Sequence, residues 1–195
     1  MEQEFKYKSY NVKIEPDEDS QNPITDWDML GTFSCFHDRY DLSNTKEFDD
    51  KEELKHYLSN NKVIYLPLYL YDHSGITIKT TPFGDSWDSG QVGFIFASYE
   101  KIKKEYNCKY ITKKIIEKVK GIFVGEVKVF DDYLTGNVYQ YTIEDAEGNH
   151  CDSCGGFYET VECLITETKQ IIDNITDVRL KDSQLEMFPE LVETI

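Results

Sequence analysis

Residues 63–75 read VIYLPLYLYDHSG, an apolar run that ends in a polar turn. Such a nearly continuous apolar run is typical of a strand that is buried on both faces of a sheet. Pro67 weakens this interpretation, because proline cannot donate a hydrogen bond to a central ladder. The pattern therefore predicts a strand over Val63–Tyr71, after which Gly75 turns the chain.

A second polar block follows twelve residues later, where residues 87–91 read WDSGQ. This block and residues 71–75 each combine a carboxylate, a hydroxyl and a glycine with an aromatic ring. Loops at binding and catalytic sites use that mixture more often than cores do. Strands are expected beside the blocks, over Ile76–Thr80 and Gln91–Ser98, so the two blocks indicate a site at loops that join strands.

Further strands and helices flank this centre. Alternating apolar residues predict a first strand over Phe5–Ile14 and a late one over Gly136–Asp145. Lys51–Ser59 has the apolar spacing of a short helix, with Asp49 or Asp50 as its N-terminal cap.

Helical spacing dominates from Tyr99 to Tyr133, with a break near residues 107–110 and with Thr112 as the cap of the second helix. Phe157–Ile175 has the spacing of a later helix. Together the elements predict an α+β single domain over residues 1–180, in which a mixed or antiparallel sheet packs against the helical hairpin and the later amphipathic helix. Residues 181–195 form an acidic C-terminal tail that either docks as a short helix or stays loose.

The chain is acidic, and its charge is unevenly distributed. It has 195 residues, 39% of them hydrophobic, which is enough for a core without metal or disulfide staples. The net charge of −16 divides into −8 over residues 1–60, +4 over residues 61–120 and −12 over residues 121–195. A strongly acidic surface repels nucleic acid and favours partners with basic grooves, including proteins that themselves bind nucleic acid. A requirement for solubility alone accounts for an acidic composition as well.

The sequence argues against several classes of protein. No stretch has the length of an apolar membrane span, and the first residues lack the basic start of a secretory signal, so we expect a soluble cytoplasmic protein without a membrane partner. Five cysteines without such a signal argue for reduced thiols. The common sequence patterns of nucleotide-binding loops, serine hydrolases and zinc proteases do not occur.

One pair of cysteines has metal-ligand spacing. Cys151 and Cys154 form a C-x2-C pair, which Cys35 and His37 could complete to a four-ligand zinc site. A single such pair is weak evidence, and ordinary thiols explain it equally well. A redox role needs the pair at the start of a helix, and two glycines follow it instead. We therefore predict neither a metal site nor another cofactor.

The candidate catalytic residues are His37, Arg39, Asp72, His73 and Asp88. The two histidines, the arginine and the carboxylates could serve as base, acid and phosphate clamp in the cleavage of a phosphodiester. His73 follows the end of the predicted central strand, where a strand end presents side chains at the edge of a sheet. Each histidine could equally satisfy a hydrogen bond within its own loop.

The candidate binding residues are Trp27, Asp28, Tyr71, Trp87 and Gln91. Trp27 and Trp87 are the only tryptophans, and each precedes an aspartate. Their alternative role is that of core anchors at the base of loops. Asp28, Asp72 and Asp88 could also coordinate Mg²⁺ together, although single carboxylates on separate loops are poor evidence for a metal site.

Five stretches occur in a recognisable order: WDxLGTxxCxHxRY at residues 27–40, PLYLYDHSG at 67–75, WDSGQVG at 87–93, YLTGxVY at 133–139 and DSCxGFY at 152–158. They resemble a family of small proteins that phages, plasmids and integrated elements encode, over about residues 26–160. The chain departs from the family at Gly155, where tryptophan is expected, and this departure alters whatever lines that part of the fold.

The resemblance implies an accessory role against host defence, since similar proteins have been described as type II anti-CRISPR inhibitors. The expected function is therefore that of an anti-CRISPR inhibitor, whose partner is a host type II effector protein or its guide RNA complex. Two alternatives stay open. One is a nuclease that cleaves guide RNA or other nucleic acid, and the other is a module that binds a small ligand or nucleotide between the two polar blocks.

Overall fold

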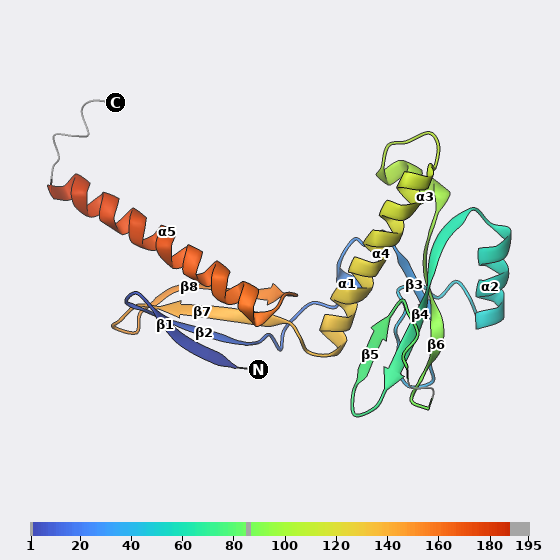
Figure 1. The fold of residues 1–195 in the computed structure, drawn as a ribbon, viewed down its shortest axis with the longest axis horizontal. Coiled ribbons are helices and arrows are strands. Elements are labelled where there is room, and N and C mark those ends of the chain that lie inside the picture. The colour runs from blue at the N-terminus through green and yellow to red at the C-terminus, as the bar shows by residue number, and fades with distance from the viewer. Residues whose placement is uncertain (1, 85–86, 188–195) are drawn as a thin grey trace. The chain divides into compact units, whose positions relative to one another are not determined.

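The computed structural model describes residues 2–84 and 87–187, with side chains as far as residue 178. The chain divides into unit 1, residues 1–20 and 137–195, and unit 2, residues 21–136. Each unit contains one antiparallel four-stranded sheet, which packs against one helix in the described part of unit 1 and is accompanied by four helices in that of unit 2 (Figure 1). The predicted α+β class is confirmed, but the strands form two sheets where one was expected.

The sheet of unit 2 has the strand order β3 (Thr32–Cys35), β6 (Ser89–Ser98), β4 (Val63–Asp72) and β5 (Ile76–Lys79). The apolar run of residues 63–71 thus forms the predicted strand, β4, and the structure places it between β6 and β5. Pro67 lies opposite Phe94 of β6, and β5 begins to pair with β4 only at Tyr69. The missing N–H of Pro67 therefore interrupts no second ladder on the β5 side.

Helices lie on both faces of this sheet (Figure 1). Along β6, Ile95 and Ala97 belong to the core beneath α4 (Lys113–Leu134), whereas Phe96 belongs to a cluster beneath α2 (Lys51–Asn60). This split follows from the alternation of side chains along a strand. The short helix α1 (Pro23–Asp26) packs against α4, and α3 (Tyr99–Glu105) follows β6 directly.

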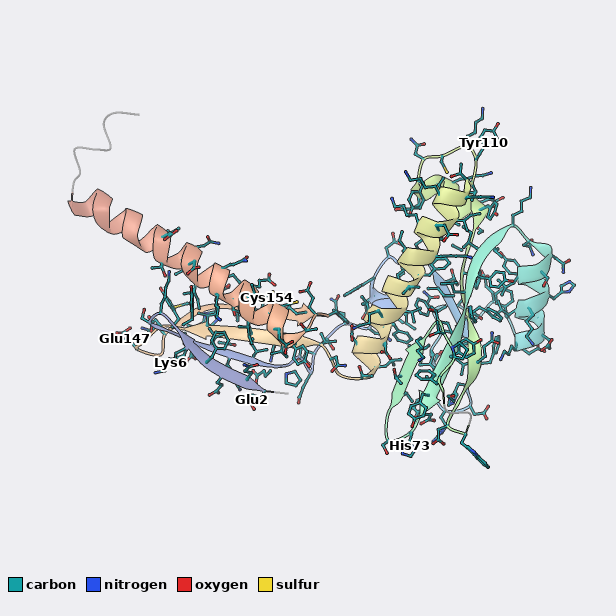
Figure 2. All side chains as sticks on the ribbon, in the orientation of Figure 1. Glu2, Lys6, His73, Tyr110, Glu147 and Cys154 are labelled. Atoms are coloured by element: carbon teal, nitrogen blue, oxygen red, sulfur yellow. The ribbon has the colours of Figure 1, made fainter. Side chains whose placement is uncertain are left out.

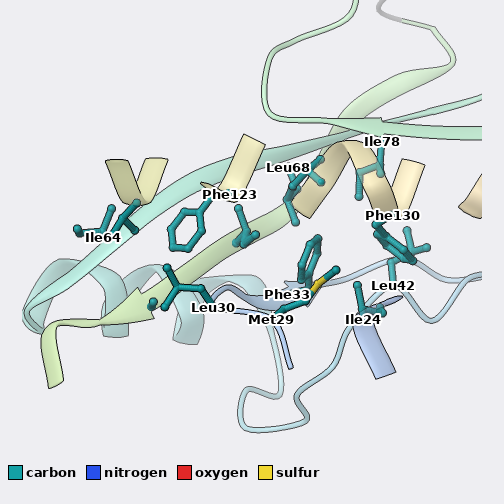
Figure 3. Close-up of a cluster of buried hydrophobic side chains, with 14 of the residues drawn as sticks. Ile24, Met29, Leu30, Phe33, Leu42, Ile64, Leu68, Ile78, Phe123 and Phe130 are labelled. Carbon is teal, nitrogen blue, oxygen red and sulfur yellow. The ribbon is translucent and has the colours of Figure 1, made fainter. Parts of the chain in front are cut away.

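The larger core lies between α4 and the sheet (Figure 3). Its centre is aromatic: the rings of Phe33 and Phe130 meet edge to face with centroids 5.5 Å apart, and both side chains are fully buried. On the opposite face α2 is only ten residues long. Tyr65 of β4 therefore keeps 44% of its surface exposed, and the prediction of a strand buried on both faces is wrong for this residue.

The predicted helices of unit 2 are confirmed. Asp50 caps α2, because its carboxylate accepts hydrogen bonds from the backbone N–H groups of Glu52 (2.9 Å) and Glu53 (2.8 Å). The helical hairpin consists of α3 and α4 with a break between them, and the Thr112 hydroxyl accepts from the backbone N–H of Ile115 at the start of α4. None of the helices in the described part of the chain combines the length and the apolar character that crossing a membrane requires.

Unit 1 brings the two ends of the chain into one sheet, in the order β1 (Gln3–Tyr7), β2 (Tyr10–Pro16), β7 (Tyr139–Glu144) and β8 (His150–Phe157). The helix α5 (Val161–Met187) packs on one face of this sheet (Figure 1). The centre of this core consists of Val12, Ile14, Tyr141, Ile143, Leu164 and Ile172. The strand predicted over Gly136–Asp145 is confirmed as β7.

Three predictions for unit 1 need correction. The segment Phe5–Ile14 is a hairpin and not one strand; the chain turns at Lys8, which has a φ of 52° and offers none of the usual turn chemistry. The helix predicted from Phe157 begins at Val161, because residues 150–157 pair with β7 as the edge strand β8. Helix α5 continues past residue 181 to Met187, and the last part of the expected acidic tail lies outside the described residues.

Candidate functional site

The candidate site lies at the end of the unit 2 sheet where β3 and β4 end and β6 begins, near His73 in Figure 2. At this end Cys35 of β3 pairs with Gly93 of β6. The backbone N–H of Asp72 donates to the carbonyl of Asp88 at 2.8 Å. Three connecting segments therefore meet, namely those that follow β3, follow β4 and precede β6.

An ion pair joins the first two segments. The Arg39 guanidinium contacts the carboxylate of Asp72, whose side chain is only 18% exposed, whereas that of Arg39 is 68% exposed. Asp72 thus fixes one side of the guanidinium against the sheet end. The remaining N–H groups of Arg39 face solvent, where they can bind an anion such as a phosphate.

A second pair joins the turn after β4 to the segment before β6. His73 Nδ1 lies 3.0 Å from Asp88 Oδ2, and both side chains are accessible, at 63% and 41% exposure. A carboxylate beside Nδ1 holds the neutral imidazole in the tautomer that carries its proton on Nδ1. His73 then presents the lone pair of Nε2, which is the state that a general base requires.

His37 has the opposite tautomer to His73. Its Nδ1 accepts a hydrogen bond from the backbone N–H of Arg39 at 3.3 Å, and its ring stacks on Tyr40 with centroids 5.1 Å apart. A neutral ring that accepts at Nδ1 carries its proton on Nε2. His37 therefore presents a donor where His73 presents an acceptor.

A hollow of about 330 Å³ lies among these groups, at the lower end of the volumes that small-ligand pockets have. It is lined by His37, Arg39, Leu70, Asp72 and residues 87–92. The Trp87 side chain in this lining is 94% exposed. Tyr71 lies beside the turn, with its ring 6.1 Å from that of His73 and 5.6 Å from that of Phe83.

Gln91 lines the hollow and also belongs to the scaffold. Its side-chain amide donates to the backbone carbonyl of Gly93 at 3.4 Å, and the backbone carbonyl of Gln91 accepts from Lys51 Nζ at 2.5 Å. Burial lowers the pKa of Lys51 at this contact. Gln91 thus connects the start of α2 to β6 as well as forming part of the wall.

Trp27 and Asp28 lie outside this cluster. Both precede β3, whereas His37 and Arg39 follow it, so the strand separates the two pairs. The indole N–H of Trp27 donates to Gln21 Oε1 at 3.1 Å. Asp28 therefore does not join the two aspartates of the site, and no group of three or more His, Cys, Asp or Glu side chains in the described part of the chain is placed to hold a metal ion.

The cysteines support neither the zinc nor the redox interpretation. Cys35 lies on β3, where burial raises the pKa of its thiol to about 12 and so suppresses the thiolate that zinc or a disulfide partner requires. Cys151 and Cys154 lie on the strand β8 and not at the start of a helix.

The sequence alone did not point to Glu126, which holds the segment before β3. Its two carboxylate oxygens accept from the backbone N–H groups of Leu30 (2.6 Å) and Gly31 (2.9 Å). Burial raises the pKa of Glu126, and these two hydrogen bonds oppose the shift. Glu126 lies 96 positions from Leu30 and 95 positions from Gly31 in the chain, so no pattern among neighbouring residues predicts these contacts.

Comparisons of this chain with protein-family models, with curated proteins and with solved structures find no match. The resemblance to proteins of mobile elements stays a prediction, and the function is argued from the geometry of the site and the charges of the two units.

Proposed function

We propose that this protein is an anti-defence inhibitor that binds a nucleic-acid-binding effector of the host through unit 1. A type II CRISPR effector, or its complex with guide RNA, is the first target to test. The distribution of charge carries this proposal: unit 1 has 19 acidic and 6 basic side chains, net −13, and unit 2 has 18 and 15, net −3. Grooves that hold nucleic acid are basic, so a compact acidic unit competes for them.

The acidic side chains of unit 1 are largely available to a partner. Only three carboxylates of this unit, those of Glu2, Glu15 and Asp173, form salt bridges with residues that the structure describes. Nine further carboxylates are exposed and form none there: Glu4, Glu18, Asp19, Glu144, Glu147, Glu159, Glu162, Glu167 and Asp177. Their charge is not neutralised inside the unit.

The outer face of α5 presents several of these carboxylates together. A shallow hollow of about 540 Å³ is lined by Glu159, Glu162, Cys163, Thr166, Glu167 and Gln170. Glu162 and Glu167 are five positions apart on α5, and both contribute carboxylates to the lining of this hollow. A row of carboxylates on a rigid helix resembles the row of phosphates that a basic groove binds.

The test incubates the purified protein with a type II effector and its guide RNA, and measures cleavage of target DNA and the length of the guide. We expect blocked cleavage that weakens as salt rises. The triple variant Glu162→Gln, Glu167→Gln, Asp177→Asn should weaken inhibition about tenfold or more. The matched control Glu47→Gln, Asp49→Asn, Glu100→Gln removes the same charge from exposed positions of unit 2 and should inhibit like the native chain. Cleavage that the native protein leaves unaffected contradicts the proposal.

A second candidate function is the cleavage of RNA at the end of the unit 2 sheet. The observation that favours it is that His37, Arg39, Asp72 and Asp88 line one hollow, while His73, which does not line it, contacts Asp88. His73 would take the proton of a ribose 2′-hydroxyl as its oxygen bonds to phosphorus, and His37 would protonate the 5′-oxygen that leaves. Arg39 would bind the phosphate, and the exposed ring of Trp87 would stack on a base.

The same incubation separates the two functions. A nuclease leaves shortened guide RNA, and His73→Ala should slow that shortening about 10²-fold or more. His56→Ala is the matched control, because His56 is exposed on α2, away from the residues that line the hollow. Intact guide RNA together with blocked DNA cleavage rejects the nuclease and supports the inhibitor.

A further inference from the structure

The strongest concentration of positive charge in this acidic chain lies on α3, the loop after it and the start of α4. Residues 99–120 contain eight lysines and three glutamates, net +5, in a protein of net charge −16. We call these eight side chains the lysine patch: Lys101, Lys103, Lys104, Lys109, Lys113, Lys114, Lys118 and Lys120. Within unit 2 the patch lies at the opposite end from His73, around Tyr110 in Figure 2.

The lysine patch keeps its charge. None of its lysines forms a salt bridge with a residue that the structure describes, whereas Lys46 and Lys128 elsewhere in unit 2 pair with Asp41 and Asp132. All of the patch is exposed except Lys120, which is half-buried. Among the residues that the structure describes, Lys101 is the one lysine of the patch whose ammonium group donates a hydrogen bond, to the carbonyl of Met29 at 2.7 Å.

An exposed aromatic ring stands among these lysines. Tyr110 lies in the loop between α3 and α4 and is 73% exposed, directly after Lys109 and three residues before Lys113. Its ring does not belong to the hydrophobic clusters of unit 2, in contrast to Tyr106, which packs against the core beneath Lys118 Nζ at 4.7 Å. An exposed ring within a set of unpaired cations is the arrangement that single-stranded nucleic acid uses, with phosphates on the lysines and a base on the ring.

We propose that the lysine patch binds a single-stranded nucleic acid, with Tyr110 as the stacking platform for a base. This binding is independent of the inhibition and of the cleavage proposed above, because it uses none of their residues. The whole chain repels nucleic acid at long range, and the repulsion is screened beyond about 10 Å at 0.1 M salt, so the local charge decides short-range binding. The ring distinguishes this partner from an acidic protein surface, which offers no base to stack.

The test measures the fluorescence anisotropy of a labelled oligouridylate of about 20 nucleotides with the full-length protein, at about 50 mM salt and above. The variant Lys103→Gln, Lys104→Gln, Lys109→Gln, Lys113→Gln should raise Kd at least about tenfold and reduce the dependence of Kd on salt. The control Lys6→Gln, Lys46→Gln, Lys55→Gln, Lys62→Gln removes the same charge from exposed positions outside the patch and should change Kd less than about threefold. Circular dichroism confirms that both variants are folded.

Tyr110 tests the stacking separately. Tyr110→Ala should raise Kd about fivefold or more, and Tyr110→Phe should restore binding, because phenylalanine keeps the ring. Absence of binding by the native protein at low salt overturns the proposal, as does an equal loss in the patch and control variants. Self-association in sedimentation that the patch variant abolishes, without binding of the oligonucleotide, would also overturn it and would assign the patch to unit 1 of a second copy.

Discussion

Gly93 lies where β6 passes closest to β3. A Cβ at this position would stand 2.0 Å from the carbonyl oxygen of Ser34 and 2.7 Å from the Cα of Cys35, so only glycine fits. Gly31 is similar, because a Cβ there would lie 2.4 Å from Ile95 and 2.7 Å from Glu126. Both glycines belong to the stretches that carry the family resemblance. Within the stretches 27–40 and 87–93, the glycines therefore allow close packing inside the fold. Only those residues of the stretches that lie at the sheet end belong to the candidate site.

Replacement of Gly93 by alanine should lower the free energy of unfolding by about 2–3 kcal/mol, because backbone atoms of β3 cannot move away cheaply. Urea denaturation followed by circular dichroism measures the loss. The matched control is Gly90→Ala in the same strand, where an added Cβ meets nothing within 4 Å and the expected change is within about 0.5 kcal/mol. Equal losses in the two variants would show that the close approach to β3 is not the cause.

Glu126 should make the stability of the protein depend on pH. Burial raises its pKa above the ordinary value of 4.5, so the folded chain binds this proton more strongly than the unfolded chain does. The resulting contribution is complete below the ordinary pKa and is lost as the pH rises through the raised pKa. Glu126→Gln removes the titration, so the stability of the variant relative to the native chain should rise as the pH rises above the ordinary pKa of 4.5.

Urea denaturation at several pH values measures this difference. The variant also loses one of two carboxylate acceptors, which lowers its stability by a constant amount at every pH. The change of the difference with pH is therefore the informative quantity, and parallel curves for the two proteins would rule out the titration of Glu126 as its origin.

At the scale of elements, side chains close the edges of the unit 2 sheet. On the outer edge of β3, the Ser43 hydroxyl and the Asn44 carbonyl oxygen accept from the backbone N–H groups of Cys35 and Phe33, each at 2.8 Å. On β5, Asp131 of α4 accepts from the backbone N–H of Ile78 at 2.7 Å. Edge strands that are covered in this way do not recruit further strands, which leaves the loops at the sheet end as the accessible part.

The structure distinguishes the two candidate N-terminal caps of α2, Asp49 and Asp50, between which the sequence does not decide. Asp50→Ala should destabilise the protein by about 1 kcal/mol, because it removes the acceptor of two backbone N–H groups. Asp49→Ala should cost clearly less, since Asp49 takes part through its backbone N–H, which donates to Glu53 at 2.8 Å. Thermal or urea unfolding compares the two variants, and a larger loss for Asp49→Ala would contradict the assignment of the cap.

At the scale of the whole molecule, the two units differ in how the chain builds them. Unit 2 is one continuous stretch with its own buried core on both faces of its sheet. Unit 1 needs both chain ends, because Val12 and Ile14 of β2 share its core with Ile143 of β7 and Leu164 of α5. Most of the net negative charge lies on unit 1, whereas the lysine patch and the candidate catalytic groups lie on unit 2.

A fragment of residues 21–136 should therefore fold by itself and show a cooperative thermal transition in circular dichroism. The fragment of residues 137–195 serves as the contrast, because it lacks β1 and β2 and should show no such transition. A non-cooperative fragment 21–136 would mean that unit 2 depends on the rest of the chain for its stability.

Local patterns determined the α+β class, most helices and strands and the cap of α4, and they narrowed the cap of α2 to Asp49 or Asp50, since periodicity and capping act within a few residues. They also selected the turn after β4 and the segment before β6, where eight of the ten candidate site residues meet or lie close by. Local patterns did not predict the hairpin at Lys8 or the strand β8. Lysine is not a typical turn residue, and a glycine-rich edge strand has little strand propensity.

Only the tertiary structure decided that the strands form two sheets, that Trp27 and Asp28 lie apart from the site, and that Glu126 holds the start of β3. The pairing of β2 with β7 joins residues such as Ile14 and Tyr141, which are far apart in the chain. The free energy of such contacts depends on which surfaces meet when the chain collapses, and a linear pattern of residues does not contain that information.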